Sequence, residues 1–435
     1  MAVREGLTGW LTRPLASFHL VLALTGVLVA VGVVMVLSAS SVSSYDPRTG
    51  GGQYSLFFKH VSYVGLGAGV FWLGLRVPIG KIRRLAGTAM VLAVCLLAAV
   101  LTPLGTTGGG AQRWFVVAGQ SVQPIEFAKL ALALWGAHVL VAKYHLLRRW
   151  RHLMVPVVPV TLVMFALVMA QPNLSGTITL GIILLGLLWF AGIPARLFAA
   201  LLAGAVAGFT VLALSAGYRT ARILSFFSAA PDSSTESYQT TQALYALADG
   251  GIFGRGLGRG SANWGYLPGV QNDFIFALLG EELGFVGCVF VIALYAGVAV
   301  VGTRIARRNL DPWIRIVAGT LTLLVVAQAA INIGYVVGLL PVTGVTLPLI
   351  SYGGSSLLIT MLLFGILANC ARNEPQAAAA LRHHGPGKFG VLLRLPAPTP
   401  YSPPRRSARQ PIRPANARPH PAGKTANRNH TGTRR

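Results

Sequence analysis

The chain contains 435 residues, of which 54% are hydrophobic and 11% are charged, and its mean hydropathy is +0.64. Soluble domains carry about 25% charged residues, so this composition excludes an ordinary soluble protein. The apolar residues form successive blocks of roughly 18 to 25, which is the length of a membrane-spanning helix. A membrane β-barrel is disfavoured, because barrel strands are short and alternate in polarity, whereas these blocks are continuous.

The formal net charge of +25 would suggest nucleic-acid binding in a soluble protein, but its placement argues against that partner. From Arg372 to Arg435 there are thirteen Lys and Arg residues against one acid, Glu374, so this tail alone carries +12. Much of the remaining positive charge falls in short loops on alternate sides of the apolar blocks. The charge therefore reports membrane topology and contact with anionic lipid, and no nucleic-acid partner is predicted.

The apolar blocks predict ten membrane-spanning helices within residues 1–372, and so an all-α, polytopic membrane protein. The predicted spans cover about residues 18–38, 57–75, 85–103, 124–142, 153–170, 176–192, 197–215, 274–301, 316–340 and 351–371. The break between the fifth and sixth spans is the least marked, since it consists of Gln171, Pro172 and Asn173 alone.

Basic residues divide the connecting loops into two sets. One set contains Arg76, Lys81, Arg83, Arg84, Lys143, Arg148, Arg149, Arg151, Arg196, Arg304, Arg307, Arg308 and Arg315, and it is followed by the basic tail. Cytoplasmic loops are enriched in Lys and Arg, so these loops and both termini are predicted to be cytoplasmic. The other loops are poor in net charge and are predicted to face outward across the cytoplasmic membrane.

Two segments lie outside the spans. Residues 216–273 form the large extracytoplasmic loop, and their aromatic residues, including Trp264 and Tyr266, favour an ordered structure with a helix near Tyr238 to Ala248. Residues 373–435 form a basic, Pro-rich cytoplasmic tail, which is predicted to be disordered beyond about residue 396 because it has few apolar residues.

Ionisable residues within spans are costly and mark either a functional site or a buried pair. Glu126 and Lys129 lie three residues apart on one helix face, so they can neutralise each other, and a purely structural ion pair remains an even alternative. Glu281 and Glu282 lie about two turns into the eighth span, where one of them could instead serve helix packing. Asp273 precedes that span and could be its N-cap, a role that does not exclude catalysis.

Most of the unusual polar residues map to the outer ends of the spans. They lie in the segments GAQRW (110–114), QPIEFAK (123–129), QPNLSGT (171–177), YLPGVQNDFIF (266–276) and PLISYGGSS (348–356). No ATP is available there, so a bond-forming enzyme needs a substrate that carries its own leaving group. A lipid-linked diphospho-sugar meets this requirement. Arg113 and Lys129 could hold its diphosphate, or a divalent cation such as Mg or Mn could lie between carboxylates and phosphate.

Four stretches carry a resemblance to a known family. They are GAQRWFVVAGQSVQPIEFAKLALALWGAHVL (110–140), GGIFGRGLG (250–258), YLPGVQNDFIFALLGEELGFVG (266–287) and INIGYVVGLLPVTGVTLPLISYGGSSLL (331–358). In their content and order the chain resembles the SEDS family (shape, elongation, division and sporulation) over about residues 15–395. It is more similar to the division-type FtsW proteins of actinobacteria than to the elongation-type RodA proteins.

The resemblance implies an inverting peptidoglycan glycosyltransferase that makes β-1,4 links between lipid II units during cell division and releases undecaprenyl diphosphate. It implies a class B penicillin-binding transpeptidase as partner at the division septum, with other division proteins reached through the basic tail. By resemblance the essential aspartate falls on Asp273, the predicted catalytic base. The substrate-binding residues are then expected to be Arg113, Glu126, Lys129, Glu281, Glu282, Ser351 and Ser355.

Five positions depart from the family's usual pattern, namely Ile125, Asn173, Asn263, Gln271 and Asn272. They leave open a paralogue with reduced activity or a different regulatory role. Two other functions also remain open. A lipid II flippase would carry charged groups on both sides of the membrane, whereas here they concentrate at one face. A non-catalytic scaffold that recruits a transpeptidase would use the basic tail as its docking arm.

Overall fold

The computed structural model describes residues 13–43, 54–108, 111–117, 119–143, 155–214, 235–260, 270–385 and 387–398. These ranges lie within one compact unit, Met1–Pro400. The expectations for Trp264, Tyr266 and Asn263, for the basic residues 148–151, and for disorder after residue 398 concern positions outside the described ranges.

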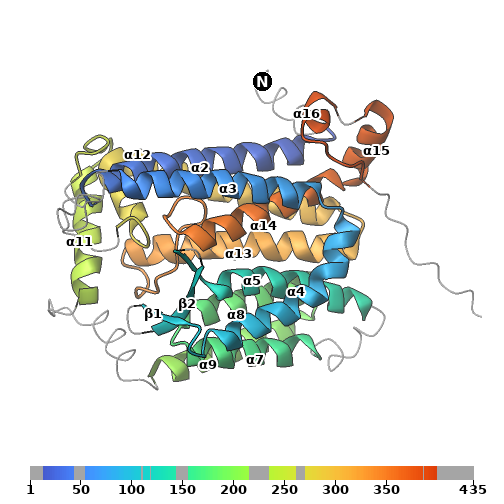
Figure 1. Cartoon of the computed structure of the whole chain (residues 1–435), viewed down its shortest axis with the longest axis horizontal. Coiled ribbons are helices and arrows are strands. Elements are labelled where there is room, and N and C mark those ends of the chain that lie inside the picture. The colour runs from blue at the N-terminus through green and yellow to red at the C-terminus, as the bar shows by residue number, and fades with distance from the viewer. Residues whose placement is uncertain are drawn as a thin grey trace, which may run out of the picture. The chain divides into compact units, whose positions relative to one another are not determined.

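Helices make up most of the unit (Figure 1). In chain order the elements are α2 (Ala16–Ser43), α3 (Ser55–Arg76), α4 (Ile79–Ala99), β1 (Thr106–Gly108), β2 (Ala111–Val117), β3 (Gln120–Val122), α5 (Pro124–Ala142), α7 (Val157–Ala170), α8 (Leu174–Phe190), α9 (Ala195–Leu214), α11 (Thr235–Gly250), α12 (Ile275–Arg308), α13 (Pro312–Val336), α14 (Gly354–Arg372), α15 (Pro375–His384) and α16 (Gly387–Leu392).

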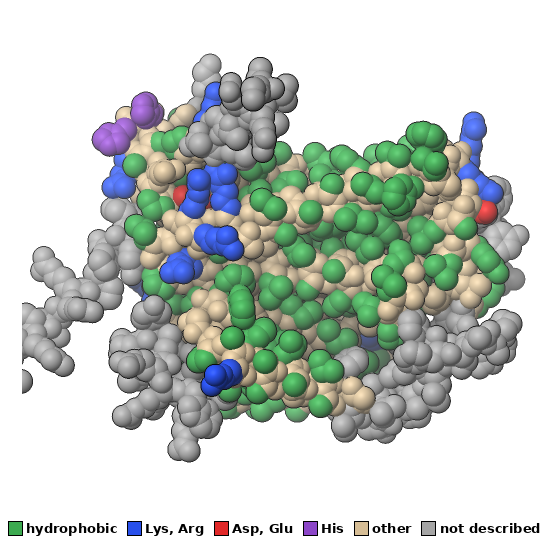
Figure 2. Space-filling model, turned by 180° about the vertical axis from the view of Figure 1, so that it is seen from behind, with side chains coloured by type: hydrophobic (Ala, Val, Ile, Leu, Met, Phe, Trp, Pro, Cys, Tyr) green, Lys and Arg blue, Asp and Glu red, His purple; other side chains and the backbone are tan. Residues whose placement is uncertain are grey.

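Each of the ten predicted spans coincides with a helix. Seven of these helices, namely α2, α3, α4, α5, α12, α13 and α14, are long and apolar enough to cross a membrane. The other three, α7, α8 and the described part of α9, are shorter apolar helices, so their role as spans stays a prediction. The chain is a multi-pass membrane protein, whose apolar outer face is visible in Figure 2.

Burial separates central from peripheral helices. The most apolar window is 72% buried in α14 and 67% buried in both α5 and α13, but 17% buried in α3 and 22% buried in α4. Peripheral helices expose large apolar side chains, such as Leu66 at 61% and Val91 at 64%. Such side chains match a hydrocarbon environment.

The basic residues lie closer to the spans than predicted. Lys81 and Arg84 were expected in a loop but are exposed in the first turns of α4, and Arg307 and Arg308 are exposed in the last turn of α12. Long basic side chains can place their charge in water while their stems cover apolar surface, so the helices continue past the hydrophobic block. Figure 2 shows Lys and Arg side chains gathered at one end of the bundle.

A kink divides α12, because Gly284 has a non-helical backbone with φ 69° and ψ −169°. The segment 251–256 after α11 packs against this kink. The amides of Phe285 and Val286 donate to carbonyls of Gly251 and Ile252, and carbonyls of Glu281 and Glu282 accept from this segment's amides. We call residues 251–256 the latch segment, since its backbone completes hydrogen bonds that the kink breaks.

The predicted helix near Tyr238 to Ala248 is confirmed by α11, which crosses the end of the bundle in Figure 1.

The fold also contains a small β-sheet, which the all-α prediction did not include. The Gly-rich loop before α5 folds into an antiparallel sheet in the order β1, β2, β3. Val117 pairs with Gln120, and Gly119 has φ 74°, so β2 and β3 form a tight hairpin.

The predicted boundary at residue 372 was placed too early. Helices α15 and α16 follow α14 directly and remain part of the same unit. Trp72 Nε1 donates to the carbonyl of Leu393 at 2.9 Å, and Arg372 donates to the carbonyl of Pro396 at 3.0 Å. These bonds hold the first residues of the predicted tail against the bundle.

Candidate functional site

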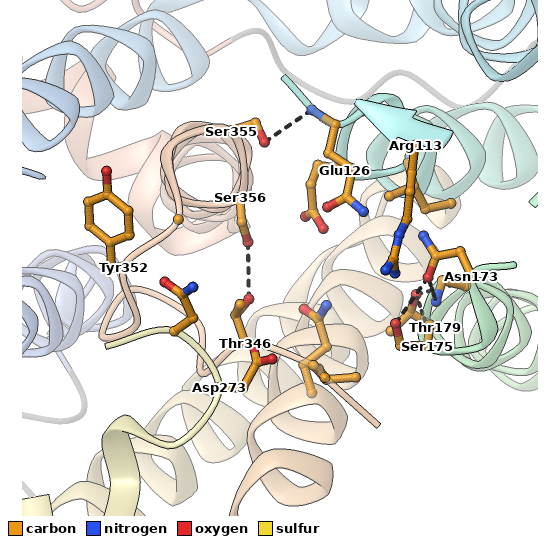
Figure 3. A pocket seen from close by; sticks show the side chains of 18 of the residues that line it. Arg113, Glu126, Asn173, Ser175, Thr179, Asp273, Thr346, Tyr352, Ser355 and Ser356 are labelled. Atoms are coloured by element: carbon orange, nitrogen blue, oxygen red, sulfur yellow. Dashed lines mark hydrogen bonds between the residues drawn. The ribbon is translucent and has the colours of Figure 1, made fainter. Parts of the chain in front are cut away.

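A cavity of about 700 Å³ opens at the end of the bundle that α11 crosses. Its walls come from α3, β2, β3, α5, α8, α11, α13, α14, the residues before α12 and the connection between α13 and α14. Figure 3 shows polar side chains from these elements directed into one space. The elements lie far apart in the sequence, so the cavity is a product of the tertiary fold.

Four helices begin at this cavity. The N-cap residues of α5, α8, α12 and α14 all line it: they are Gln123, Asn173, Phe274 and Gly353. Each helix N-terminus carries a partial positive charge of roughly half a unit and unpaired amides. Four such ends around one space favour an anionic ligand.

Asp273 lines the cavity immediately before the start of α12. A Cβ added to Gly344 would lie 3.5 Å from Asp273 Oδ2, so the carboxylate is close to that loop. Its backbone carbonyl accepts from Asn332 Nδ2 at 2.9 Å and from Tyr335 Oη at 2.8 Å. The alternative that Asp273 is the N-cap is wrong, because Phe274 is the N-cap and α12 has no side-chain cap. These two hydrogen bonds hold the main chain of Asp273 in place, and its side chain lines the cavity.

Burial raises the pKa of Asp273 to about 6, while the nearby charge of Arg113 acts in the opposite direction. Removing a carboxylate from water disfavours its ionised form, and a cation favours it. A carboxylate with a pKa near 6 is still ionised at neutral pH and is a stronger base than an exposed aspartate. This is the property required of a general base.

Glu126 and Lys129 form the predicted pair on the first turns of α5. Lys129 Nζ lies 2.9 Å from Glu126 Oε1 and 2.8 Å from Oε2, and both side chains are buried. Both residues also line the cavity. The pair is therefore structural and at the same time accessible to a ligand.

Arg113 reaches the cavity from β2, the middle strand of the unpredicted sheet. In Figure 3 its guanidinium points toward the beginning of α8, where Asn173, Ser175 and Thr179 lie. A planar guanidinium with several donors is suited to phosphate. The sheet thus positions a cation that sequence analysis had placed in an irregular loop.

The two candidate serines have different positions. Ser355 lines the cavity, and its Oγ accepts from the amide of Gln123 at 3.3 Å, which joins α14 to the start of α5. Ser351 is buried outside the cavity lining, and its Oγ accepts from the amide of Leu347 at 2.8 Å. Ser351 therefore stabilises a turn, and the structure gives it no contact with the cavity.

Glu281 and Glu282 also lie away from the cavity lining, contrary to their expected role in substrate binding. Glu282 Oε1 accepts from Ser38 Oγ on α2 and from the amide of Gly258 at 3.1 Å. A Cβ at Gly260 would lie 2.7 Å from Glu281 Oε2. Both carboxylates face the segment that follows the latch segment, a contact between distant parts of the chain that no local pattern predicts.

Several residues of the cavity lining were not predicted from the sequence. Asn173 was noted as a departure from the family pattern but was not assigned to the site. Other lining residues that were not predicted are Lys59, Tyr63, Gln239, Gln328, Thr346, Tyr352 and Ser356. A usable signal existed for Asn173, Tyr352 and Ser356, because QPNLSGT and PLISYGGSS were already placed at the outer ends of spans. Lys59 is a charged residue within the predicted span 57–75, which was also a signal, whereas Gln239, Gln328 and Thr346 come from segments without unusual charge.

Within the described ranges, no three His, Cys, Asp or Glu side chains are grouped as a resident metal site would require. Glu126 and Asp273 are the carboxylates of the cavity lining, and Glu126 is paired with Lys129. Mg²⁺ is commonly bound by one or two carboxylates together with substrate phosphates. The residues present therefore fit a divalent cation that takes Asp273 as one ligand and oxygen atoms of a bound ligand as the others.

Known proteins similar to this chain share most of its length. The family model described as "Cell cycle protein", for FtsW, RodA and SpoVE, matches residues 18–376. The probable peptidoglycan glycosyltransferases FtsW of Mycobacterium tuberculosis and Mycobacterium bovis are each 48% identical over 420 residues, which is 96% of this chain and 80% of the relative. Stage V sporulation protein E of Bacillus subtilis is 36% identical over 83% of this chain and 98% of its own length.

Solved structures show the same fold. A chain of a peptidoglycan synthase complex that coordinates polymerization and crosslinking matches with a TM-score of 0.67 and 27% identity, over 82% of this chain and 98% of that chain. The rod shape determining protein RodA of Thermus thermophilus matches with a TM-score of 0.58 and 26% identity, over 82% of this chain and 96% of its own.

Proposed function

The chain belongs to the family of cell cycle proteins that includes FtsW, RodA and SpoVE, and we propose that its cavity joins lipid II units into glycan strands. It is a peptidoglycan glycosyltransferase of the division type, as its mycobacterial relatives are named. The observation that carries the proposal is the meeting of one basic carboxylate, three cationic side chains and four helix N-termini in one cavity. That combination suits a reaction in which a hydroxyl attacks and a diphosphate leaves.

Asp273 is the general base of this reaction. Its carboxylate takes the proton from the 4-hydroxyl of the acceptor GlcNAc while that oxygen bonds to the anomeric carbon of the donor MurNAc. The bond from this carbon to the diphosphate breaks, and undecaprenyl diphosphate leaves with the electron pair. Attack opposite to the leaving group inverts the anomeric carbon and gives a β-1,4 link.

Arg113 and Lys129 stabilise the negative charge that develops on the leaving diphosphate, and Glu126 positions Lys129 through their ion pair. Fixed cations aimed at developing charge are among the strongest catalytic effects in enzymes. A divalent cation bound to Asp273 and the diphosphate would supply further charge neutralisation.

Polymerisation by the purified protein tests this proposal. Full-length protein in detergent is incubated with labelled lipid II and Mg²⁺, alone and with a class B penicillin-binding transpeptidase, and glycan polymer is resolved on a gel. The parent chain should form polymer, and Asp273→Asn should form none while its thermal midpoint stays the same or rises. Asp249→Asn, a change to a half-exposed acid of α11, is the matched control and should polymerise normally. Full polymerisation by Asp273→Asn would remove Asp273 from the mechanism.

The cavity end is proposed to face outward, with the basic end in the cytoplasm, because Lys and Arg are retained on the cytoplasmic side. In a background with exposed Cys95 replaced by Ser, Gln239→Cys in the cavity lining should react with an impermeant maleimide added to intact cells. Arg307→Cys at the basic end should react after the cells are opened. The reverse pattern would contradict the orientation and with it the chemistry.

A transpeptidase partner is proposed on related grounds. A similar chain belongs to a complex that coordinates polymerization and crosslinking, and glycan strands must be crosslinked after they form. Division proteins reached through the basic tail, and location at the septum, complete the proposal. Copurification of the chain with a class B penicillin-binding protein, with and without residues 401–435, tests both contacts.

A further inference from the structure

We propose that the N-terminal end of α8, with Asn173 as its central donor, is the subsite for the diphosphate group that leaves the donor substrate. This inference rests on the proposed function and deepens it, because it assigns one wall of the cavity to one half of one substrate. It adds Asn173 to the site and gives the residue a direct contact with the ligand through its side-chain amide.

The side chain of Asn173 has an unmet donor. Asn173 is 2% exposed, and its Oδ1 accepts from the amide of Gly176 at 2.9 Å and from Ser175 Oγ at 3.0 Å. Its Nδ2 has no hydrogen-bond partner within the described ranges although it is buried. Buried amide groups are normally paired, so this donor calls for an acceptor from a ligand.

The orientation of the Asn173 amide is fixed by its neighbours. The Gly176 amide can only donate, so the atom facing it must be the oxygen. A flipped side chain would bring two donors together. Nδ2 is therefore held on the opposite side, in a residue that lines the cavity.

The start of α8 offers further donors. In its first turn the Gly176 and Thr177 amides are already used, by Asn173 Oδ1 and by the Asn173 carbonyl. The Ser175 amide has no partner among the described residues, and Ser175 lines the cavity. Figure 3 shows the Arg113 guanidinium directed at this same end of α8. A guanidinium, a side-chain amide and a helix N-terminus together match the several oxygens of a diphosphate.

The location of this subsite relative to Asp273 indicates which diphosphate it binds. It is the diphosphate that leaves the donor, not the one that stays on the acceptor. In Figure 3 Asp273 and Asn173 lie on separate walls of the cavity. The base must contact the acceptor hydroxyl, and the leaving group must lie across the reacting carbon from it. The acceptor's own diphosphate is separated from that hydroxyl by a whole disaccharide, so it lies outside this arrangement.

An isosteric variant separates binding from folding. Asp is as good an N-cap as Asn, and both oxygens of Asn173→Asp can still accept from Gly176 and Ser175. The variant replaces the Nδ2 donor by negative charge, which repels a diphosphate. Asn173→Ser keeps an N-cap and replaces the amide donor by a shorter hydroxyl without adding charge. Both variants should fold, and only the first should repel the ligand.

The test measures the dissociation constant of undecaprenyl diphosphate for the full-length protein in detergent with EDTA present. We expect Asn173→Asp to bind about tenfold or more weakly than the parent and Asn173→Ser to be intermediate, since hydrogen bonds to charged groups are the strong ones. Adding Mg²⁺ should restore part of the affinity of Asn173→Asp, because a cation can bridge two anionic groups. Asn373→Asp at the other end of the bundle is the matched control and should bind as the parent does.

Undecaprenol, which lacks the diphosphate, separates recognition of the headgroup from recognition of the prenyl chain. Its affinity should be the same for the parent and for Asn173→Asp. Equal affinity of parent and Asn173→Asp for undecaprenyl diphosphate would overturn the inference, and so would an equal loss for undecaprenol. If the parent polymerises lipid II while either of these results is found, the subsite alone fails. If the parent binds the diphosphate through Asn173 but makes no polymer, the proposed function fails and the subsite stands.

Discussion

The two ends of the helical bundle use the same residue types for different purposes. At the basic end, Asn369 Nδ2 donates to the carbonyl of Val77 at 2.7 Å, and Asn309 Nδ2 donates to that of Cys370 at 3.3 Å. These bonds hold the connection between α3 and α4 and the connection between α12 and α13 against α14. At the cavity end, Asn332 likewise holds the main chain of Asp273, but Asn173 keeps a donor for the cavity. A buried polar side chain thus becomes a binding group where the fold leaves one of its atoms unmatched.

Charge follows the same contrast. At the basic end Lys and Arg side chains are exposed on helix termini, as in Figure 2, where water screens them. At the cavity end Lys129 and Glu126 are buried beside a space bounded by helix N-termini. Substitutions should therefore have large effects at one end and small effects at the other.

The largest effect on stability is expected from Lys129→Met. It leaves the buried carboxylate of Glu126 without its partner, which should cost about 3–5 kcal/mol in the free energy of unfolding. Thermal unfolding in detergent measures this loss. The double variant that adds Glu126→Gln should recover much of the stability. A single variant as stable as the parent would show that the pair is not buried as described.

Arg113→Ala should have the next largest effect, on turnover rather than on folding. Loss of one preorganised donor to developing charge typically lowers the rate by about 10²–10³-fold. Lipid II polymerisation and a thermal shift, measured on the same preparation, separate the two. A drop in the thermal midpoint that accounts for the lost activity would assign Arg113 a structural role.

Gly254→Ala tests the latch segment. Gly254 has φ 79°, and a Cβ there would overlap the carbonyl oxygen of Glu282 and crowd the amide of Gly284. Strain of this kind costs of order 1–3 kcal/mol, which thermal unfolding should detect. Gly87→Ala in α4, where a Cβ meets nothing within 4 Å, is the matched control and should be neutral or stabilising. Equal stability of the two variants would rule out close contact at the latch segment.

The pH dependence of polymerisation should report Asp273. A general base acts in its ionised form, so the rate should fall as the pH drops through about 6. Because Arg113 lowers the pKa of this group, the residual activity of Arg113→Ala should fall off at a higher pH. A profile that is flat between pH 5 and 8 would exclude Asp273 as the titrating base.

The same shift predicts a small gain in stability for Asp273→Asn. The folded pKa lies above the ordinary value of 3.8, so ionisation destabilises the folded state as the pH rises from about 4 to 6, and the penalty is complete above that range. The variant should therefore unfold at a higher temperature than the parent at pH 7.5. The difference should vanish near pH 4.

The smallest effect is expected at the basic end. Arg307→Gln removes an exposed charge from the last turn of α12 and should change the free energy of unfolding by less than about 0.5 kcal/mol. Polymerisation in detergent should be unchanged. A marked loss of activity would mean that the two ends of the bundle are coupled.

Hydrophobic blocks were enough to place every long helix, because a span must be apolar over its whole length. The Glu126 and Lys129 pair could also be predicted, since both residues lie on one helix and helical spacing alone brings them together. Asp273 was identified as a candidate site residue, and the alternative that it caps the helix was wrong because the helix begins one residue later than assumed.

Other parts of the site depended on contacts between distant segments. Glu281 and Glu282 were assigned to substrate because nothing in a helix pattern shows that residues 251–260 cover them. Arg113 was expected in a loop, since strands as short as β1 and β3 leave little sequence pattern around the turn at Gly119. The role of Asn173 depends on which of its atoms the neighbouring amide and hydroxyl leave unmatched, and this is visible only in three dimensions.

The latch segment bonds to α12 through main-chain atoms. In evolution, its length is therefore more constrained than its side chains. Side chains such as Ile252 and Phe253 are exposed and can be exchanged freely. The spacing between Gly251 and Gly256 cannot, because inserting or deleting one residue would misalign every carbonyl with its amide. Divergence in this stretch should therefore proceed by replacement alone, at constant length.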